Sequence, residues 1–136
     1  MNNNNLNTIR VKLDNTWLML KLTYGLLFVI AGADKFMNLV THWGQYVSPH
    51  VLQLIPVTAT QFIYGVGIIE IIIGAVILFF ATRVGAYLAA AWLVLIVVNL
   101  LTMLTYFDIA VRDLVMAVGA IALGQLTTIK ELWAQK

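Results

Sequence analysis

Apolar residues in this chain gather into four long stretches, at about 16–33, 60–80, 84–104 and 109–129, separated by more polar segments. A helix needs about 20 mainly apolar residues to cross a bilayer, which these stretches provide. None alternates apolar and polar residues as a membrane-barrel strand does, and backbone groups in lipid must be paired internally, which favours helices. The pattern predicts an all-α membrane protein, a four-helix transmembrane bundle forming one domain over residues 1–136.

The segments between these stretches predict how the helices follow one another. The connections at 81–83 and 105–108 are short, so the second and third helices, and the third and fourth, are expected to be antiparallel neighbours. Only the first connection, 34–59, is long enough to have structure of its own.

Composition supports a membrane protein and excludes several other classes. The chain is 62% hydrophobic and 10% charged, far from the roughly 25% charged residues of soluble domains. A net charge of +2 is too small to indicate nucleic acid as a partner. Without cysteine there can be no disulfide, thiol catalysis or cysteine-ligated cluster. The expected partners are the lipid bilayer and either other membrane subunits or further copies of the chain.

The distribution of basic residues predicts the orientation of the bundle. With four spans both termini lie on one side, and that side carries six of the eight basic residues, namely Arg10, Lys12, Lys21, Arg83, Lys130 and Lys136. Basic residues accumulate on the cytoplasmic side of membrane proteins. Cytoplasmic N and C termini and an external 34–59 connection are therefore expected.

The N-terminal region has a second interpretation. Basic residues before a short apolar stretch that ends in Ala31, Gly32 and Ala33 also match a cleavable signal peptide. A four-span protein needs no separate export signal, which favours a retained first helix. Apolar residues at helical spacing over 6–17, beside two basic residues, are typical of a segment lying along the inner interface before the chain turns into the membrane.

Glu70 is the main functional clue because it lies near the middle of the second stretch. A charged side chain at that depth costs about 2.5–3.5 kcal/mol on insertion scales and normally marks a buried partner or a functional site. Glu70 lies about 15 Å from either end of its helix, too deep to reach the headgroups. It is the candidate catalytic residue, although a purely structural ion pair is an equal alternative.

Other polar residues are predicted to form a binding pocket above Glu70. Asp34, Lys35, Asn99, Arg112 and Asp113 all fall in the outer half of their helices. Taken singly, the charged ones are also typical of boundary residues that reach the headgroups. We expect a network of Glu70, Asn99 and Arg112, in which Arg112 contacts Glu70 through a bridge more readily than directly.

The long connection is a candidate lid over this pocket, since it contains several aromatic and aliphatic residues before Pro56. It also holds the only two histidines, His42 and His50. Two ligands do not complete a zinc or haem site, so no metal and no covalently bound cofactor is expected. Sequence signatures of common catalytic sites are absent.

Four segments make the chain resemble the DoxX family of small four-helix membrane proteins. They are YGLLF at 24–28, AGADKF at 31–36, GIIEIIIG at 67–74 and RDL at 112–114. The resemblance covers essentially the whole chain through short motifs. It implies a bacterial inner-membrane protein, with relatives linked to quinone-coupled sulfur or oxidase chemistry or to membrane redox complexes.

Three functions remain open at this point. The chain is expected to be a small subunit or partner of a quinone-linked redox system, with a quinone as the candidate ligand near Glu70. The alternatives are a transporter for a small solute and a scaffolding subunit in which Glu70 is structural. A transporter would favour inverted repeats and broken helices, and neither is evident in the sequence.

Overall fold

The computed structural model describes residues 2–135, which fold into helices and turns without any strand. Four long helical segments dominate: α1 (Asn3–Met37), α3 (Ala59–Ala75) with its continuation η2 (Val76–Phe80), α4 (Thr82–Thr102) and α5 (Phe107–Ala134). Two short helical pieces, η1 (Trp43–Tyr46) and α2 (Pro49–Leu54), lie in the long connection. The four segments are long and apolar enough to cross a membrane, which indicates a multi-pass membrane protein.

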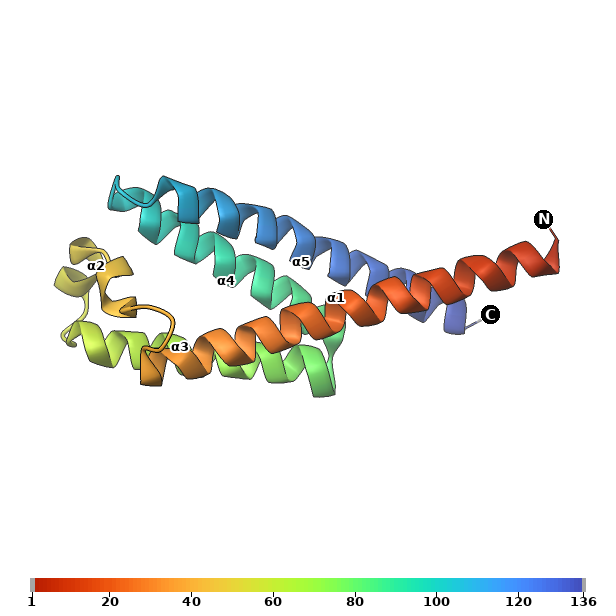
Figure 1. Ribbon diagram of the computed structural model, residues 1–136, viewed down its shortest axis with the longest axis horizontal. Coiled ribbons are helices and arrows are strands. Elements are labelled where there is room, and N and C mark those ends of the chain that lie inside the picture. Colours follow the sequence, from red (N-terminus) through yellow and green to blue (C-terminus); the bar gives the residue numbers. More distant parts are fainter. Residues whose placement is uncertain (1, 136) are drawn as a thin grey trace.

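Both ends of the chain lie at one end of the molecule, which we call the termini end (Figure 1). The opposite end, which we call the connection end, contains η1, α2 and the turn between α4 and α5. The first helix is longer than predicted. It starts at Asn3 and its 35 residues correspond to about 52 Å. The expected interfacial segment over 6–17 is therefore part of one continuous helix, and its first turns extend beyond the rest of the bundle (Figure 1).

The helices pack as two antiparallel pairs. One pair is α1 with α3, and the other is α4 with α5. The prediction that the second and third apolar helices are neighbours holds only near the turn at Ala81, because α3 and α4 have little contact elsewhere. Towards the connection end the two pairs diverge, and η1 and α2 lie there (Figure 1).

Glycines allow α1 and α3 to approach each other closely. A Cβ built on Gly67 would lie 2.7 Å from the carbonyl oxygen of Gly32, and one built on Gly74 would lie 2.7 Å from that of Gly25. The two contacts fix one antiparallel register, since the residue numbers of each pair add up to 99. The same register sets Met37, the end of α1, about level with Phe62, roughly one turn inside the start of α3.

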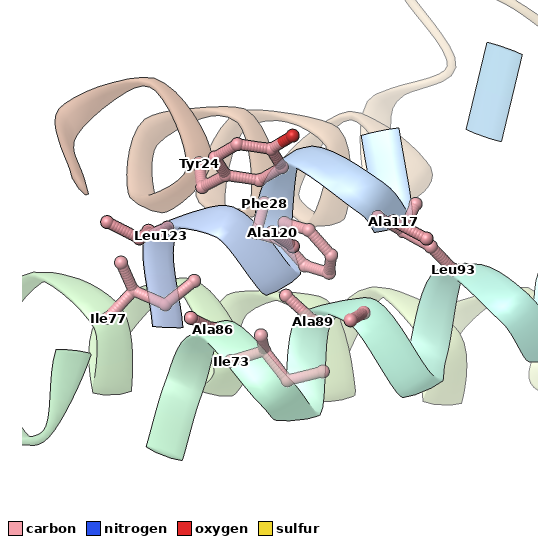
Figure 2. Packing of buried hydrophobic residues seen from close by; sticks show 11 residues of the cluster. Tyr24, Phe28, Ile73, Ile77, Ala86, Ala89, Leu93, Ala117, Ala120 and Leu123 are labelled. Carbon is pink, nitrogen blue, oxygen red and sulfur yellow. The ribbon is translucent and has the colours of Figure 1, made fainter. Parts of the chain in front are cut away.

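The two pairs meet in an apolar core nearer the termini end. Tyr24 and Phe28 of α1 and Ile73 and Ile77 of the α3 segment pack with a surface of the other pair that consists mostly of alanines. That surface contains Ala86, Ala89, Ala117, Ala120 and Leu123 (Figure 2). Alanines bring α4 and α5 close together, and the Tyr24 hydroxyl donates a hydrogen bond of 2.7 Å to a carbonyl oxygen of α5. Large aliphatic and aromatic side chains cover the outside of the bundle, as expected of a surface in contact with lipid.

Candidate functional site

A buried ion pair joins α1 to α3. The Lys35 ammonium lies 2.6 Å from the Glu70 carboxylate, and the two side chains are only 5% and 6% exposed. Glu70 is one turn from Gly67 on the buried face of α3. In the register set by the glycine contacts, the last residue of α1 lies level with Phe62 of α3. Lys35 therefore lies beside the buried part of α3, and its Nζ reaches the Glu70 carboxylate. Its position in the last turn of α1 also places the ammonium near helix carbonyls, where cations are stabilised.

The start of the long connection folds back over this pair. The Lys35 ammonium lies 3.8 Å from the centre of the Trp43 ring, a cation–π contact. The indole Nε1 of Trp43 donates a 2.7 Å hydrogen bond to Asp34. Asp34 also accepts hydrogen bonds from the backbone N–H groups of Leu39 and Val40, just after α1 ends at a left-handed Asn38. Asp34 thus shapes the turn that places Trp43 on Lys35.

Asn99 fixes the middle of the connection to α4. Its Nδ2 donates to the carbonyl oxygen of Tyr46 at 2.6 Å, and its Oδ1 accepts from the backbone N–H of Ser48 at 3.1 Å. The Ser48 side chain is fully buried and accepts a hydrogen bond from Thr102. The Tyr46 ring packs edge-on against Tyr106, with ring centres 4.9 Å apart. The connection is therefore docked onto the connection end of α4 and α5.

Asp113 and Arg112 form a separate pair at the start of α5. The Nε of Arg112 donates a hydrogen bond of 3.2 Å to Asp113. Asp113 is buried, whereas the Arg112 side chain is 63% exposed. The predicted network of Glu70, Asn99 and Arg112 is wrong, because the partner of Glu70 is Lys35, Asn99 binds the connection, and Arg112 binds Asp113.

The predicted pocket residues therefore divide into three groups. Asp34 and Lys35 lie with Glu70 at the buried ion pair, directly or through Trp43. Asn99 contacts the segment that covers the pair, and Arg112 and Asp113 pair beside it. Trp43 and Trp92 were missed by the sequence analysis. Trp43 could have been identified from an indole nine residues after the acid–base pair, but its fold over Lys35 depends on the turn at Asn38.

Trp92 of α4 brings an unpartnered donor to the site. Its indole Nε1 lies close to the Glu70 carboxyl but outside hydrogen-bonding geometry. It is buried and has no hydrogen-bond partner within residues 2–135. Trp92 thus brings a third donor-bearing side chain to the ion pair, from a helix outside the α1–α3 pair.

The buried charges do not balance. Three carboxylates, those of Asp34, Glu70 and Asp113, are buried at this end of the molecule, together with one ammonium, that of Lys35. Asp34 has three N–H donors and Asp113 has the Arg112 guanidinium. Glu70 has the Lys35 ammonium, and theirs is the most deeply buried ion pair of the described residues. No group of three or more His, Asp or Glu side chains in the described residues is arranged to hold a metal ion.

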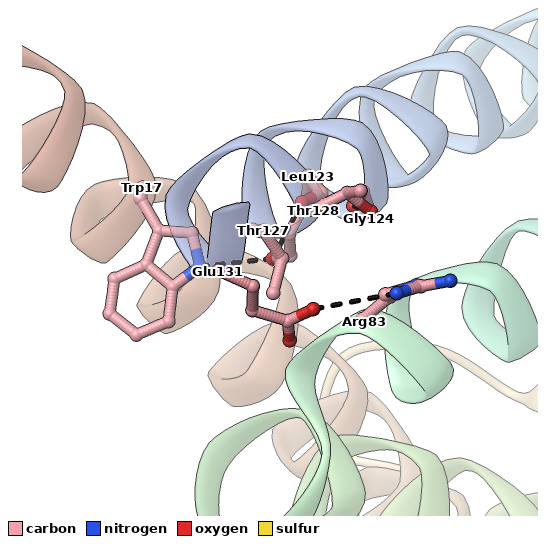
Figure 3. Close-up of polar contacts among 7 residues, drawn as sticks. All are labelled: Trp17, Arg83, Leu123, Gly124, Thr127, Thr128 and Glu131. Atoms are coloured by element: carbon pink, nitrogen blue, oxygen red, sulfur yellow. Dashed lines mark hydrogen bonds and ion pairs between the residues drawn. The ribbon is translucent and has the colours of Figure 1, made fainter. Parts of the chain in front are cut away.

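A second polar cluster lies at the termini end. The indole Nε1 of Trp17 donates to Thr127 at 2.9 Å, and Arg83 and Glu131 form an exposed pair at 3.4 Å (Figure 3). Lys130 lies 3.9 Å from the centre of the Trp17 ring. Trp17, Thr127, Lys130 and Glu131 line a cleft of about 270 Å³ between α1, the η2–α4 turn and α5.

No family model, curated protein or solved structure matches the chain.

Proposed function

We propose that the chain is a DoxX-like protein of a bacterial inner membrane, with both termini in the cytoplasm, that acts as a small subunit or partner of a quinone-linked redox system. The Lys35–Glu70 pair is the site at which a quinone headgroup binds. The observation that carries this proposal is the burial of an ion pair beneath a docked connecting segment, next to the indole donor of Trp92.

The side chains at the pair suit a quinone headgroup. Its two carbonyl oxygens are hydrogen-bond acceptors, and the Lys35 ammonium and Trp92 Nε1 are donors on two different helices. The Trp43 ring offers an aromatic face on the same side as the ammonium. A quinone supplies a carrier of electrons and protons when bound. Glu70 accepts a hydrogen bond from the Lys35 ammonium. Its carboxyl group is therefore placed to hold a proton or to deliver one to a headgroup oxygen.

Access to the pair requires the connection to move. Trp43 covers Lys35, and the hydrogen bonds of Asn99 keep the next turn against α4. Opening at Trp43 breaks its hydrogen bond to the Asp34 carboxylate, worth about 1.5–3 kcal/mol, and its cation–π contact with the buried Lys35 ammonium, worth about 2 kcal/mol. Such a cost is compatible with a segment that opens on binding.

A scaffolding role is the second candidate, and a specific observation favours it. The pair joins the same two helices that the glycine contacts bring together, so it can act as a register lock for α1 and α3. The two functions differ in what they require of Glu70. A register lock requires only that the side chains at positions 35 and 70 hold the two helices together. A quinone site requires the Lys35 and Trp92 donors and the Glu70 carboxylate themselves.

Quinone binding can be measured through the tryptophans at the site. We would replace Trp17 and Trp133, which lie at the termini end, by Phe, so that Trp43 and Trp92 report alone. Saturable quenching by decylubiquinone or a short-chain menaquinone analogue is expected. Glu70→Gln should weaken it about tenfold, because the Lys35 ammonium that donates to a headgroup oxygen loses the carboxylate that positions it.

Asp108→Asn is the matched control, since Asp108 is an exposed acid at the same end and should leave binding unchanged. Quenching that is equal in Glu70→Gln and Asp108→Asn would show that the quinone only partitions into the detergent and would contradict the proposed site.

A further inference from the structure

We propose that the cleft at the termini end binds the phosphate headgroup of an anionic phospholipid. The site is separate from the Lys35–Glu70 pair and goes beyond the proposed function. It lies where the end of the α3 segment, the start of α4 and the end of α5 meet α1.

The cleft combines cationic and apolar walls. Lys130, Trp17 and Thr127 line one part, and the turn residues Phe80 and Ala81 line another. The Lys130 ammonium is held over the Trp17 ring, whose Nε1 is fixed by Thr127, so the cation is positioned rather than free. Arg83 adjoins the cleft through its pair with Glu131 (Figure 3).

A second ammonium lies near the same indole. Lys21 is 5.0 Å from the centre of the Trp17 ring and Lys130 is 3.9 Å from it. The two nitrogens are therefore at most 3.9 + 5.0 = 8.9 Å apart. The two like charges repel each other, and a nearby anion offsets this repulsion. One acid, Asp14, already contacts Lys130 at 2.7 Å. A phosphate adds further negative charge where the lysines gather.

The acids already present do not neutralise this end. Five basic residues lie there, Arg10, Lys12, Lys21, Arg83 and Lys130, against two acids, Asp14 and Glu131, a balance of 5 − 2 = +3 for the described residues. The connection end has two basic residues, Lys35 and Arg112, against four acids, Asp34, Glu70, Asp108 and Asp113, a balance of 2 − 4 = −2. An anionic ligand is thus expected at the termini end.

The surroundings favour a lipid over a free anion. Phe79 and Phe80, in the π-helical end of the α3 segment, are 77% and 82% exposed beside the cleft. Such rings at the end of an apolar helix contact acyl chains, while tryptophan and lysine suit the headgroup layer. Basic pockets between membrane helices, on the cytoplasmic side, are typical sites for anionic headgroups.

The ion pairs of the cleft can accommodate a phosphate. The pairs Arg83–Glu131 and Lys130–Asp14 keep a third to a half of their side-chain surfaces exposed. Exposed pairs of this kind stabilise a fold by only about 0–1 kcal/mol. A phosphate can therefore share or replace the carboxylate at little cost.

Only one face of α1 contributes to the site, so a basic residue on the opposite face provides a matched control. Arg10, Asp14, Trp17 and Lys21 follow one another at spacings of four, three and four residues, and the first three contact α5. This spacing puts them on one side of the helix. Lys12 is exposed on the opposite side at the same end, so Lys12→Gln removes one positive charge without touching the cleft.

The test compares lipid binding by the detergent-purified protein, followed by native mass spectrometry and by Tm. Phosphatidylglycerol is expected to bind and raise Tm, whereas phosphatidylcholine with the same acyl chains and free glycerol 3-phosphate should do neither. The Arg83→Gln/Lys130→Gln variant should lose at least about tenfold in affinity for phosphatidylglycerol, while Lys12→Gln should retain wild-type binding. Ala134→Trp, which fills the cleft without changing charge, should also weaken binding.

Ala134→Trp keeps the test decisive if the double variant does not fold. Equal loss in Lys12→Gln and in the double variant would show diffuse attraction to the helix ends and overturn the site. Equal stabilisation by glycerol 3-phosphate would show a site for a free anion and overturn the lipid assignment. Quinone binding is measured separately by quenching at Trp43 and Trp92, so each proposal can fail alone.

Discussion

Gly67→Ala tests the close contact that sets the register of the Lys35–Glu70 pair. The added Cβ would lie 2.7 Å from the carbonyl oxygen of Gly32 and 3.0 Å from the Phe36 ring. The first contact is with backbone, so rotation of a side chain cannot relieve it. Gly65→Ala is the matched control in the same helix, because nothing lies within 4 Å of its new Cβ.

The two variants should change stability in opposite directions. Each gains up to about 1 kcal/mol of helix propensity, and Gly67→Ala also pays about 1–3 kcal/mol for overpacking. A difference of about 1–3 kcal/mol between them is expected, or about 3–5 °C in Tm for each kcal/mol in a chain of this size. Gly67→Ala should also weaken quinone binding, because Lys35 Cβ lies 3.2 Å from the new methyl group.

The measurement is thermal unfolding of both variants in the same detergent, followed by tryptophan fluorescence. Equal stability of Gly67→Ala and Gly65→Ala would show that α1 and α3 are not packed at this distance. The register argument for the ion pair would then be refuted.

Three further predictions concern orientation, the docked connection and the core. A cysteine at Leu54, which is 84% exposed, should react with an impermeant thiol reagent in intact cells and one at Gln135 should not; the reverse pattern would contradict cytoplasmic termini. Asn99→Leu removes two hydrogen bonds to the connection, each worth about 0.5–1.5 kcal/mol, so the Ser48 amide should exchange its hydrogen at least about tenfold faster, and unchanged exchange would refute docking through Asn99. Tyr24→Phe should lower the free energy of unfolding by about 1 kcal/mol through loss of the hydroxyl bond to α5, and an unchanged Tm would contradict that bond.

The helices were predictable because their apolar runs are dense and long. The start of α1 was not, since hydropathy identifies the part of a helix that suits lipid, while the backbone hydrogen bonds of residues 3–15 continue the helix beyond it. The pairing of α1 with α3 followed only in part from the sequence. The seven-residue spacing of Gly67 and Gly74 puts both on one face of α3 where a helix can approach closely, but it does not tell which helix does so.

The partner of Glu70 was mispredicted for a geometrical reason. Lys35 lies in the last turn of its helix, where lysines usually extend outwards to headgroups. Close packing at Gly32 ends α1 inside the start of α3, and Trp43 then covers the ammonium. Both effects depend on tertiary contacts. The sequence therefore allowed Lys35 to be predicted as a pocket residue, but it did not show that the ammonium points inwards to Glu70.

The most direct test of a functional Lys35–Glu70 pair is the double variant Lys35→Met/Glu70→Met. Single substitutions leave one buried charge unpaired, at a cost of about 3–5 kcal/mol, whereas replacing both partners of a buried pair with apolar residues is often neutral or stabilising. The double variant should therefore keep its membrane abundance and Tm, and saturable quenching of Trp43 and Trp92 by decylubiquinone should be lost. A double variant that is equally stable and binds the quinone as tightly as the wild-type chain would contradict the account and identify the pair as structural.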